Sequence, residues 1–172
     1  MRTVVLRVVA LALLLLLALF GAIAVRTMQR LPDLTVYFVR DLGTSFTLVP
    51  DHEKVGRLQP EERVRWQVEK LVAGPELGSG LTTTLPEGTR LLGASTNEGV
   101  LTVDLSSEFE QGGGTALMAG RLNQLFYTLT QPKDVDAVRL RVEGREVFVF
   151  SGDGLEVEQP WVRSRHPELP VW

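Results

Sequence analysis

The sequence predicts an α+β domain preceded by one N-terminal transmembrane helix. The domain is expected to be a two-layer sandwich, in which a mixed or antiparallel sheet carries two helices on one face. Segments with strand-like alternation and helix-like periodicity intermingle in the order β(β)–α–ββ–α–ββ. Each of the two helical segments has a single apolar stripe, and one sheet face can cover both stripes. The transmembrane helix is predicted from an uninterrupted apolar run near the N-terminus.

That apolar run extends from Val8 to Val25, with Arg2 and Arg7 before it. A helix of this length would measure about 27 Å at about 1.5 Å per residue. The hydrocarbon core of a bilayer is about 30 Å thick, so the segment is long enough to anchor the chain. The side chains expected to contact lipid are spread along the whole run and include Val8, Leu13, Leu16, Phe20 and Val25.

Two interpretations of this segment stay open. It is either a retained signal anchor or a signal peptide cleaved after Ala24, where small residues precede the cut. The run is longer than a typical signal core, and Arg26 and Arg30 follow it closely, which favours retention. A short basic leader usually stays inside, so we expect a single-pass protein of the cell membrane with an extracytoplasmic domain. Cleavage would instead give a secreted or periplasmic protein.

Composition limits the function of the remaining chain. The protein has 18 Lys and Arg against 21 Asp and Glu, and three of the arginines lie within residues 1–26, so the domain itself is acidic. Such a domain repels phosphate backbones, and we expect no nucleic-acid partner. The chain has no cysteine, which excludes disulfides, thiolate metal sites and an acylated cysteine. We divide it into the anchor (1–26), a linker (27–33), the domain (34–152) and a tail (153–172).

The first half of the domain contains two expected strands and one helix. Residues 34–39 are β-branched and aromatic, and 46–49 form a shorter strand that Pro50 is expected to stop. The helix begins near Pro60, which suits a first turn, and ends at Gly74. Its apolar stripe follows the i, i+4, i+7, i+8 spacing and consists of Val64, Val68, Leu71 and Val72.

The second half has two expected hairpins with a helix between them. Residues 90–96 and 100–105 flank an Asn-Glu-Gly turn, and 138–142 pair with 146–150. A glycine-rich connector at 111–114 leads into the helix, whose stripe contains Met118, Leu122, Leu125, Phe126 and Leu129. Gly120 within that helix is either a place of close helix–sheet approach or an accidental surface glycine. Residues 151–172 are expected to be an irregular tail.

Two features are candidate partner surfaces. The sheet face away from the helices should carry Thr102, Asp104, Arg139 and Arg141, open to water or to a partner. The tail carries Trp161 and Trp172. These rings either lie in a groove of their own domain, or dock a partner or the membrane surface, where tryptophan is enriched.

Residue patterns that would indicate catalysis or a metal centre are weak, and we expect no catalytic residue, cofactor or metal. His52 lacks the helical spacing of a zinc site, and His166 is expected to face solvent in the tail. Glycosidases need two flanking carboxylates, and the acidic residues that offer such a pair are Asp104, Glu108 and Glu110. Their positions on a polar strand face and in a connector favour a solvated role instead.

Four stretches of the chain resemble the GerMN domain family of sporulation and spore-germination proteins. They are LVAGP (71–75), GLTTTLPEGTRLL (80–92), GVLTVDLSSEF (99–109) and RLNQLFYTLT (121–130). With the first strand they span residues 34–152. The resemblance implies an exported, non-catalytic cell-envelope module, related in fold to the ring-building modules of sporulation channels. The chain departs from the family's namesake because it lacks the lipidation cysteine and has one such domain where that protein has two.

The expected function is therefore a non-enzymatic binding or scaffold module of the cell envelope. It would be held in the membrane by its N-terminal helix and would contact envelope proteins or peptidoglycan. Self-association into a homo-oligomer, through strand edges or through the open sheet face, is part of this expectation. The alternative is a peptidoglycan-acting hydrolase that uses the carboxylates of residues 104–110, or a regulator of a separate hydrolase.

Overall fold

The computed structural model describes residues 13–21, 33–131, 134–150 and 154–172. These residues form two compact units, which are described separately. One contains residues 1–33 with 54–57, and the other contains residues 34–53 with 58–172. The predicted linker falls outside the described residues except for Asp33, where the first strand begins.

In the N-terminal unit, residues 13–21 are helical. Leu13, Leu16 and Phe20 are 56%, 62% and 74% exposed. Val8 and Val25, the outer limits of the predicted anchor, lie outside the described residues. Within the part of the chain that the structure describes, no helix is long and apolar enough to cross a membrane.

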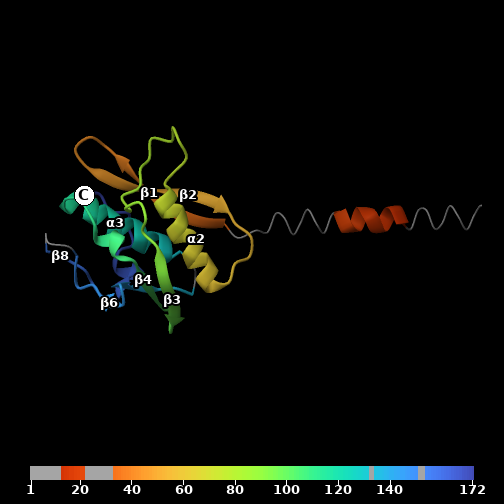
Figure 1. The fold of residues 1–172 in the computed structure, drawn as a ribbon. Helices are drawn as coiled ribbons and strands as arrows, with labels where there is room; N and C mark the ends of the chain where they lie inside the picture. The colour runs from red at the N-terminus through yellow and green to blue at the C-terminus, as the bar shows by residue number, and fades with distance from the viewer. Residues whose placement is uncertain (1–12, 22–32, 132–133, 151–153) are drawn as a thin grey trace, which may run out of the picture. The chain divides into compact units, whose positions relative to one another are not determined.

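The main sheet of the domain, of which Figure 1 labels β3, β4 and β6, has five strands. Four of them lie in the order β3 (Leu91–Asn97), β4 (Val100–Leu105), β5 (Ala137–Val142) and β6 (Arg145–Glu146). The fifth strand, β9 (Trp161–Val162), pairs with the start of β5. Because β4 and β5 are parallel and the other pairs are antiparallel, the sheet is mixed. The predicted α+β class with a mixed or antiparallel sheet is confirmed.

Both tight turns of this sheet have the sequence Glu-Gly. Glu98 and Gly99 join β3 to β4, and Glu143 and Gly144 join β5 to β6, all four with positive φ. Positive φ at both central residues defines the type I′ turn, whose twist matches that of a two-stranded ribbon. The first turn places Leu101, Val103 and Leu105 on the buried face of β4 and the polar residues on the other, as the alternation predicted.

The two predicted helices are confirmed, and both pack into one apolar core with the sheet. Helix α2 covers Pro60–Ala73, and the Glu62 carboxylate accepts a hydrogen bond from the Gln59 N–H (2.8 Å) that caps its first turn. Helix α3 covers Thr115–Leu129. Two 3₁₀ turns were not predicted: η1 (Ser107–Glu110) before α3 and η2 (Arg163–Arg165) near the end of the chain.

A separate two-stranded sheet contains β1 (Asp33–Asp41) and β2 (Phe46–Lys54). The prediction that Pro50 stops the second strand is wrong, because β2 continues to Lys54. Proline removes the backbone N–H of one residue. Over most of its length β2 pairs only with β1, so it needs backbone donors on that side alone. Among the residues that the structure describes, its outer side is paired at its beginning alone, where Phe46 and Trp172 exchange two backbone hydrogen bonds of 2.8 and 3.1 Å.

The predicted strand 146–150 does not stay in the main sheet. β6 ends at Glu146, the Val147 N–H still donates to the Leu140 carbonyl of β5 (3.2 Å), and β7 (Val149–Phe150) pairs instead with β8 (Leu155–Glu156). The Gln159 side chain lies between the backbones of Leu140 and Val147. Its amide accepts from the Leu140 N–H (3.0 Å) and donates to the Leu140 and Val147 carbonyls at 3.2 and 2.7 Å. A side chain thus satisfies backbone groups that a strand would normally pair.

The prediction of an irregular tail is also wrong. Residues 155–172 contain β8, β9 and η2, and they belong to the same compact unit as the rest of the domain. Trp161 is opposite Val138 in the sheet and is only 6% exposed. Trp172 packs against Phe46, with ring centroids 6.1 Å apart. Local patterns failed here because these short strands exist only through distant partners.

Helix α3 is enclosed on most of its surface, and a buried polar stripe on it holds the remaining segments. This α3 polar stripe consists of Arg121, Gln124 and Thr128. Gln124 donates to the Tyr37 carbonyl (3.0 Å), and Thr128 accepts from the Tyr37 N–H (3.0 Å), which fixes β1 beside the helix. Gln124 also accepts from both the backbone N–H and the hydroxyl of Thr84, at 2.7 and 2.5 Å.

Arg121 connects the stripe to the segment before α3. Its guanidinium donates to the carbonyls of Thr84, Phe109 and Gly112 at 3.0, 2.6 and 3.1 Å. Burial lowers the pKa of Arg121, since desolvation disfavours the charged form. Three backbone carbonyls, rather than a carboxylate, compensate the cost of burying the guanidinium group.

The structure explains Gly120 through a close approach to the tail and a loop rather than to the sheet. A Cβ at this position would lie 3.0 Å from Trp172 and 3.1 Å from Thr84. The absence of a side chain therefore allows Trp172 to lie across α3. There its indole N–H donates to the Ala116 carbonyl at 2.9 Å.

Replacing the centre of the α3 polar stripe should destabilise the domain. Gln124→Leu keeps the volume but leaves the Tyr37 carbonyl and the Thr84 N–H buried without partners. We expect the free energy of unfolding to fall by roughly 2–4 kcal/mol, because each unpaired buried group costs about 1–3 kcal/mol. Denaturant unfolding measures this change. The control, Gln131→Leu at a half-buried position just after the end of α3, should cost under about 1 kcal/mol; equal losses would contradict the central role of Gln124.

The tail should contribute substantially to stability. Trp161→Ala removes a buried ring that stacks on Phe126, with centroids 5.2 Å apart. We expect a loss of about 3–5 kcal/mol in unfolding free energy, typical of a truncated core aromatic. Thermal and denaturant unfolding test it, with Leu169→Ala in the same segment as an exposed control. A loss below about 1 kcal/mol for Trp161→Ala would mean that the tail is only loosely attached.

Candidate functional site

The predicted open face of the sheet exists and brings its four residues together. On the parallel pair β4–β5, Thr102 is opposite Arg139 and Asp104 is opposite Arg141. Directly opposite residues project from the same side of a sheet. All four side chains are exposed or half-buried, whereas their neighbours on the other face are in the core. This set is called the open sheet face below.

Most charges of the open sheet face already have partners within the domain. Asp104 accepts a hydrogen bond from the Gly144 N–H (2.9 Å), which steadies the β5–β6 turn. Arg139 forms an ion pair with Glu146 (3.2 Å). Arg141 is exposed, and among the described residues its guanidinium has no ion-pair or hydrogen-bond partner. It is therefore the charge on this face that is available to a partner.

The candidate catalytic carboxylates are engaged in structural contacts. Both oxygens of Glu110 accept from Arg145, at 2.9 and 2.7 Å, and Glu108 lies 3.7 Å from Arg90. The Ser106 hydroxyl and the local backbone lower the pKa of Glu108, and Arg90 adds to the effect. A general acid for glycoside cleavage needs a raised pKa. This cluster therefore joins η1 to neighbouring strands and does not have the properties of an acid–base pair.

The two histidines lie in different surroundings. His52 Nδ1 is 3.1 Å from the Thr35 hydroxyl on the exposed surface of the β1–β2 sheet. His166 was expected to face solvent, but its ring stacks on Trp161 with centroids 4.8 Å apart, and its Nε2 lies 3.2 Å from Glu158. No group of three or more metal-ligating side chains occurs among the described residues.

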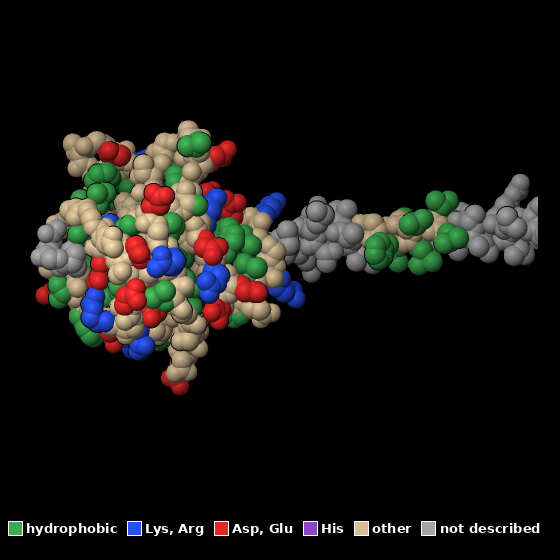
Figure 2. All heavy atoms as spheres, in the orientation of Figure 1, with side chains coloured by type: hydrophobic (Ala, Val, Ile, Leu, Met, Phe, Trp, Pro, Cys, Tyr) green, Lys and Arg blue, Asp and Glu red, His purple; other side chains and the backbone are tan. Residues whose placement is uncertain are grey.

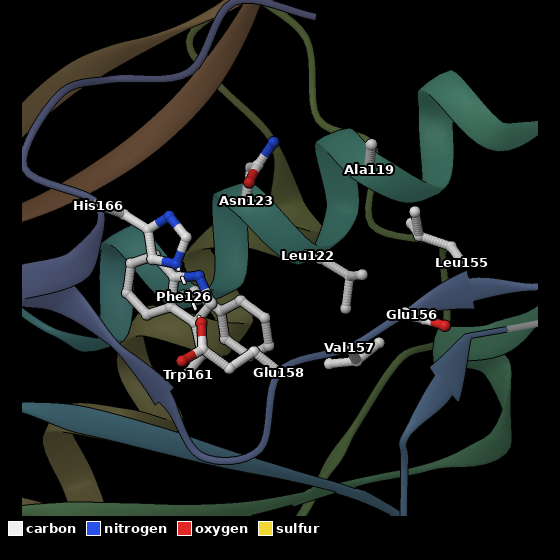
Figure 3. Close-up of a pocket in the computed structure, with 10 residues that line it drawn as sticks. All are labelled: Ala119, Leu122, Asn123, Phe126, Leu155, Glu156, Val157, Glu158, Trp161 and His166. Carbon is white, nitrogen blue, oxygen red and sulfur yellow. Dashed lines mark hydrogen bonds and ion pairs between the residues drawn. The ribbon is translucent and has the colours of Figure 1, made fainter.

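The site that sequence reasoning missed is a groove beside α3, shown in Figure 3. It encloses about 230 Å³ between the helix and residues 155–158. On the helix side it is lined by Ala119, Leu122, Asn123 and Phe126, and on the other by Leu155, Glu156, Val157 and Glu158, with Trp161 and His166 at one end. We call it the α3–β8 groove.

An aromatic stack and an ion pair close one end of the α3–β8 groove. Trp161 stacks with Phe126 (5.2 Å between centroids, 16° between planes) and with His166 (4.8 Å, 7°). Glu158 bonds to both His166 and Arg165. The hydrogen bond from His166 and the charge of Arg165 together lower the pKa of Glu158. The side chains at this end therefore already contact one another, whereas Glu156 has no ion-pair partner among the described side chains.

The sequence contained one half of the signal for this groove. Ala119 and Asn123 are four residues apart along one edge of the apolar stripe of α3, beside Leu122 and Phe126, where the small and polar residues mark the limit of the core. The other wall comes from residues expected to form an irregular tail. No local pattern could place that wall against α3, because the contact depends on β9 joining the sheet.

The face of the domain shown in Figure 2 carries acidic and basic side chains interspersed, without a large patch of one sign. Association by charge alone is therefore not favoured on this face. Binding on this face would need either pairing between specific charged residues or contact between apolar surfaces. Of the two surfaces described above, the open sheet face offers one free charge, and the α3–β8 groove offers an apolar floor.

Comparisons with solved structures give the same fold. The chain superposes on the first GerMN domain of the sporulation protein GerM from Bacillus subtilis with a TM-score of 0.65 and 20% identity, covering 77% of this chain and 98% of that one. The tandem GerMN domains of the same protein match at 0.63 and 24%, covering 76% and 45%. A putative lipoprotein from Clostridium perfringens matches at 0.55 and 19%, covering 77% and 88%.

This chain thus spans less than half of the tandem GerMN structure. At these identities the likeness establishes the fold alone. The comparison with curated proteins gave no match. The family model for Germane, described as sporulation and spore germination, matches residues 35–148, which is well over half of the chain. The predicted GerMN resemblance is confirmed, and the chain belongs to the Germane family of sporulation and spore-germination domains.

Proposed function

We propose that this protein is a non-catalytic binding or scaffold module of the cell envelope. It is anchored in the membrane by residues 8–25, with its GerMN-type domain outside the cytoplasm, and acts in cell-wall, sporulation or germination processes. The family description supports the process, and the apolar leader supports the location. The module works by holding other envelope components, either proteins or peptidoglycan.

The observation that carries the proposal is the unpaired outer edge of β3. This strand ends the main sheet, and among the described strands it pairs with β4 alone. Asn97 and Val100 flank a two-residue turn and form a hydrogen-bonded pair, so the alternation of an antiparallel ladder directs the N–H and C=O of Ala94 and Thr96 outward. An unpaired edge of this kind is a template for another strand. A second copy or an envelope protein can therefore extend the sheet.

Chemical features favour binding over hydrolysis. Asp104, Glu108 and Glu110 each serve a hydrogen bond or ion pair that supports the fold. The lowered pKa of Glu108 is opposite to what a catalytic acid requires. A regulator of a separate wall hydrolase would use the same β3 edge, and so it falls within the proposed class of binding module.

Blocking the β3 edge should weaken assembly. Thr96→Pro removes an outward N–H while leaving the bonds to β4, and Thr96→Ala is the matched control that keeps the N–H. With a photoreactive amino acid at the exposed Leu92, we expect crosslinks in native membranes to fall about tenfold in Thr96→Pro only. Loss of one or two hydrogen bonds costs about 1–2 kcal/mol, which corresponds to that factor. Unchanged crosslinking, or a strict monomer without crosslinks, would count against an edge contact.

Removing the leader should release the protein from the membrane. We expect the full chain to remain in membranes after a high-salt carbonate wash and to enter detergent, and the chain without residues 8–25 to be soluble. The reason is that a span of this length buries enough apolar surface for essentially irreversible insertion. Fractionation with N-terminal sequencing of the mature protein tests this. A mature chain that begins near Val25 would show that the leader is cleaved and overturn the anchor.

A further inference from the structure

The α3–β8 groove lies on the side of α3 that the rest of the domain leaves uncovered. Between Met118 and Thr130 every residue of the helix is buried except Ala119 and Asn123. Both of these line the groove. The sheet, α2, β1 and the tail cover the other sides, so the groove is where a further segment can contact the central helix of the domain.

One wall of this groove is an unpaired strand edge. β8 pairs with β7 on one side, and the Val157 N–H donates to the Phe148 carbonyl (2.9 Å). The alternation of the antiparallel ladder then points the N–H and C=O of Glu156 away from β7. Four consecutive residues, 155–158, line the groove, so this edge is within reach of an occupant. An extended peptide can pair with it as an added strand.

The floor of the groove suits an apolar side chain better than a sugar. It is built mainly from Leu122, Phe126 and Val157, and its volume of about 230 Å³ admits a large aliphatic or aromatic side chain. The Trp161 ring is stacked with Phe126 and with His166, so it is not available as a platform on which a sugar ring could lie.

Charged residues at the edge of the groove determine which residues of an occupant can flank that apolar side chain. Glu156 is exposed and has no ion-pair partner among the described residues, and Glu158 lies next along the same wall. The nearby Arg165 and His166 side chains are already bonded to Glu158. An incoming lysine or arginine therefore finds a free carboxylate at Glu156, whereas an incoming acidic residue is repelled.

We propose that the α3–β8 groove binds an extended peptide segment of a partner protein. The segment adds a strand to β8 and inserts an apolar side chain between α3 and residues 155–158. A basic residue beside the apolar one pairs with Glu156. This inference rests on the proposed function, since it names the class of partner that such a binding module takes.

The test uses the full-length protein in detergent micelles and an array of five-residue peptides. The central residue of each peptide is Leu, Phe, Ser or Asp, and the flanking residues are Lys, Thr or Glu. We expect Leu or Phe centres with Lys flanks to bind at least tenfold more tightly than Ser centres or Glu flanks. Equal binding across the array would overturn the proposal. Binding of N-acetylglucosamine oligomers that displaces the peptides would also overturn it in favour of a glycan.

Two variants locate the binding. Ala119→Trp fills the groove from the helix side and should reduce peptide binding at least tenfold, whereas Glu69→Trp, on the exposed side of α2, should not. Glu156→Lys should reverse the preference to Glu-flanked peptides, which keeps the proposal falsifiable if Ala119→Trp fails to fold. Unchanged binding in Ala119→Trp, or an unchanged preference in Glu156→Lys, would refute the groove as the site.

The remaining outcomes separate this inference from the proposed function. If Ala119→Trp abolishes self-association and no peptide binds, the occupant is a second copy and the peptide proposal falls. If peptides do not bind but the β3-edge crosslinks persist, the inference fails and the binding module stands. If peptides bind as expected but Thr96→Pro leaves crosslinking unchanged, the groove stands without the β3 edge.

Discussion

The α3 polar stripe is the interaction on which the rest of the domain depends. A helix enclosed on nearly all sides would normally be apolar all round, but Arg121, Gln124 and Thr128 lie along one side of α3. Their partners are backbone groups of β1, of the 82–84 loop and of the residues before α3. These segments lack a full set of ladder partners, and α3 supplies the missing hydrogen bonds. A buried polar network of this kind specifies one arrangement, because any other would leave its members unpaired.

This constraint also shapes the surface that remains for function. Because β1, the sheet and the tail cover most of α3 between Met118 and Thr130, the half-buried residues of this stretch are Ala119 and Asn123, and the groove forms there. Asp104 bonds to the β5–β6 turn, and Glu110 pairs with Arg145 of β6. The surfaces described above are strand edges, the open sheet face and the α3–β8 groove.

Much of the fold could be predicted from local patterns, and the wrong predictions for the last part of the chain have a common cause. The α2 and α3 helices and the β3–β4 hairpin carry their periodicity, caps and turn residues within a short stretch of chain. The last twenty residues do not. β9 is two residues long and pairs Trp161 with Val138 of β5, and the Gln159 side chain bridges the backbones of Leu140 and Val147. Neither contact produces a periodic pattern in the sequence. The groove was missed for the same reason, since one of its walls is built from that segment.

The sequence by itself determined the α+β class, the order of the elements, the acidic domain behind an apolar leader and the family resemblance. These follow from hydrophobic period, turn chemistry and composition, which are local properties of the chain. Only the tertiary structure decided which polar residues of α3 are buried, where the tail lies and which side of the helix stays open. Those outcomes depend on which distant backbone groups need partners, and the energy of a buried hydrogen bond appears only when both groups have been brought together.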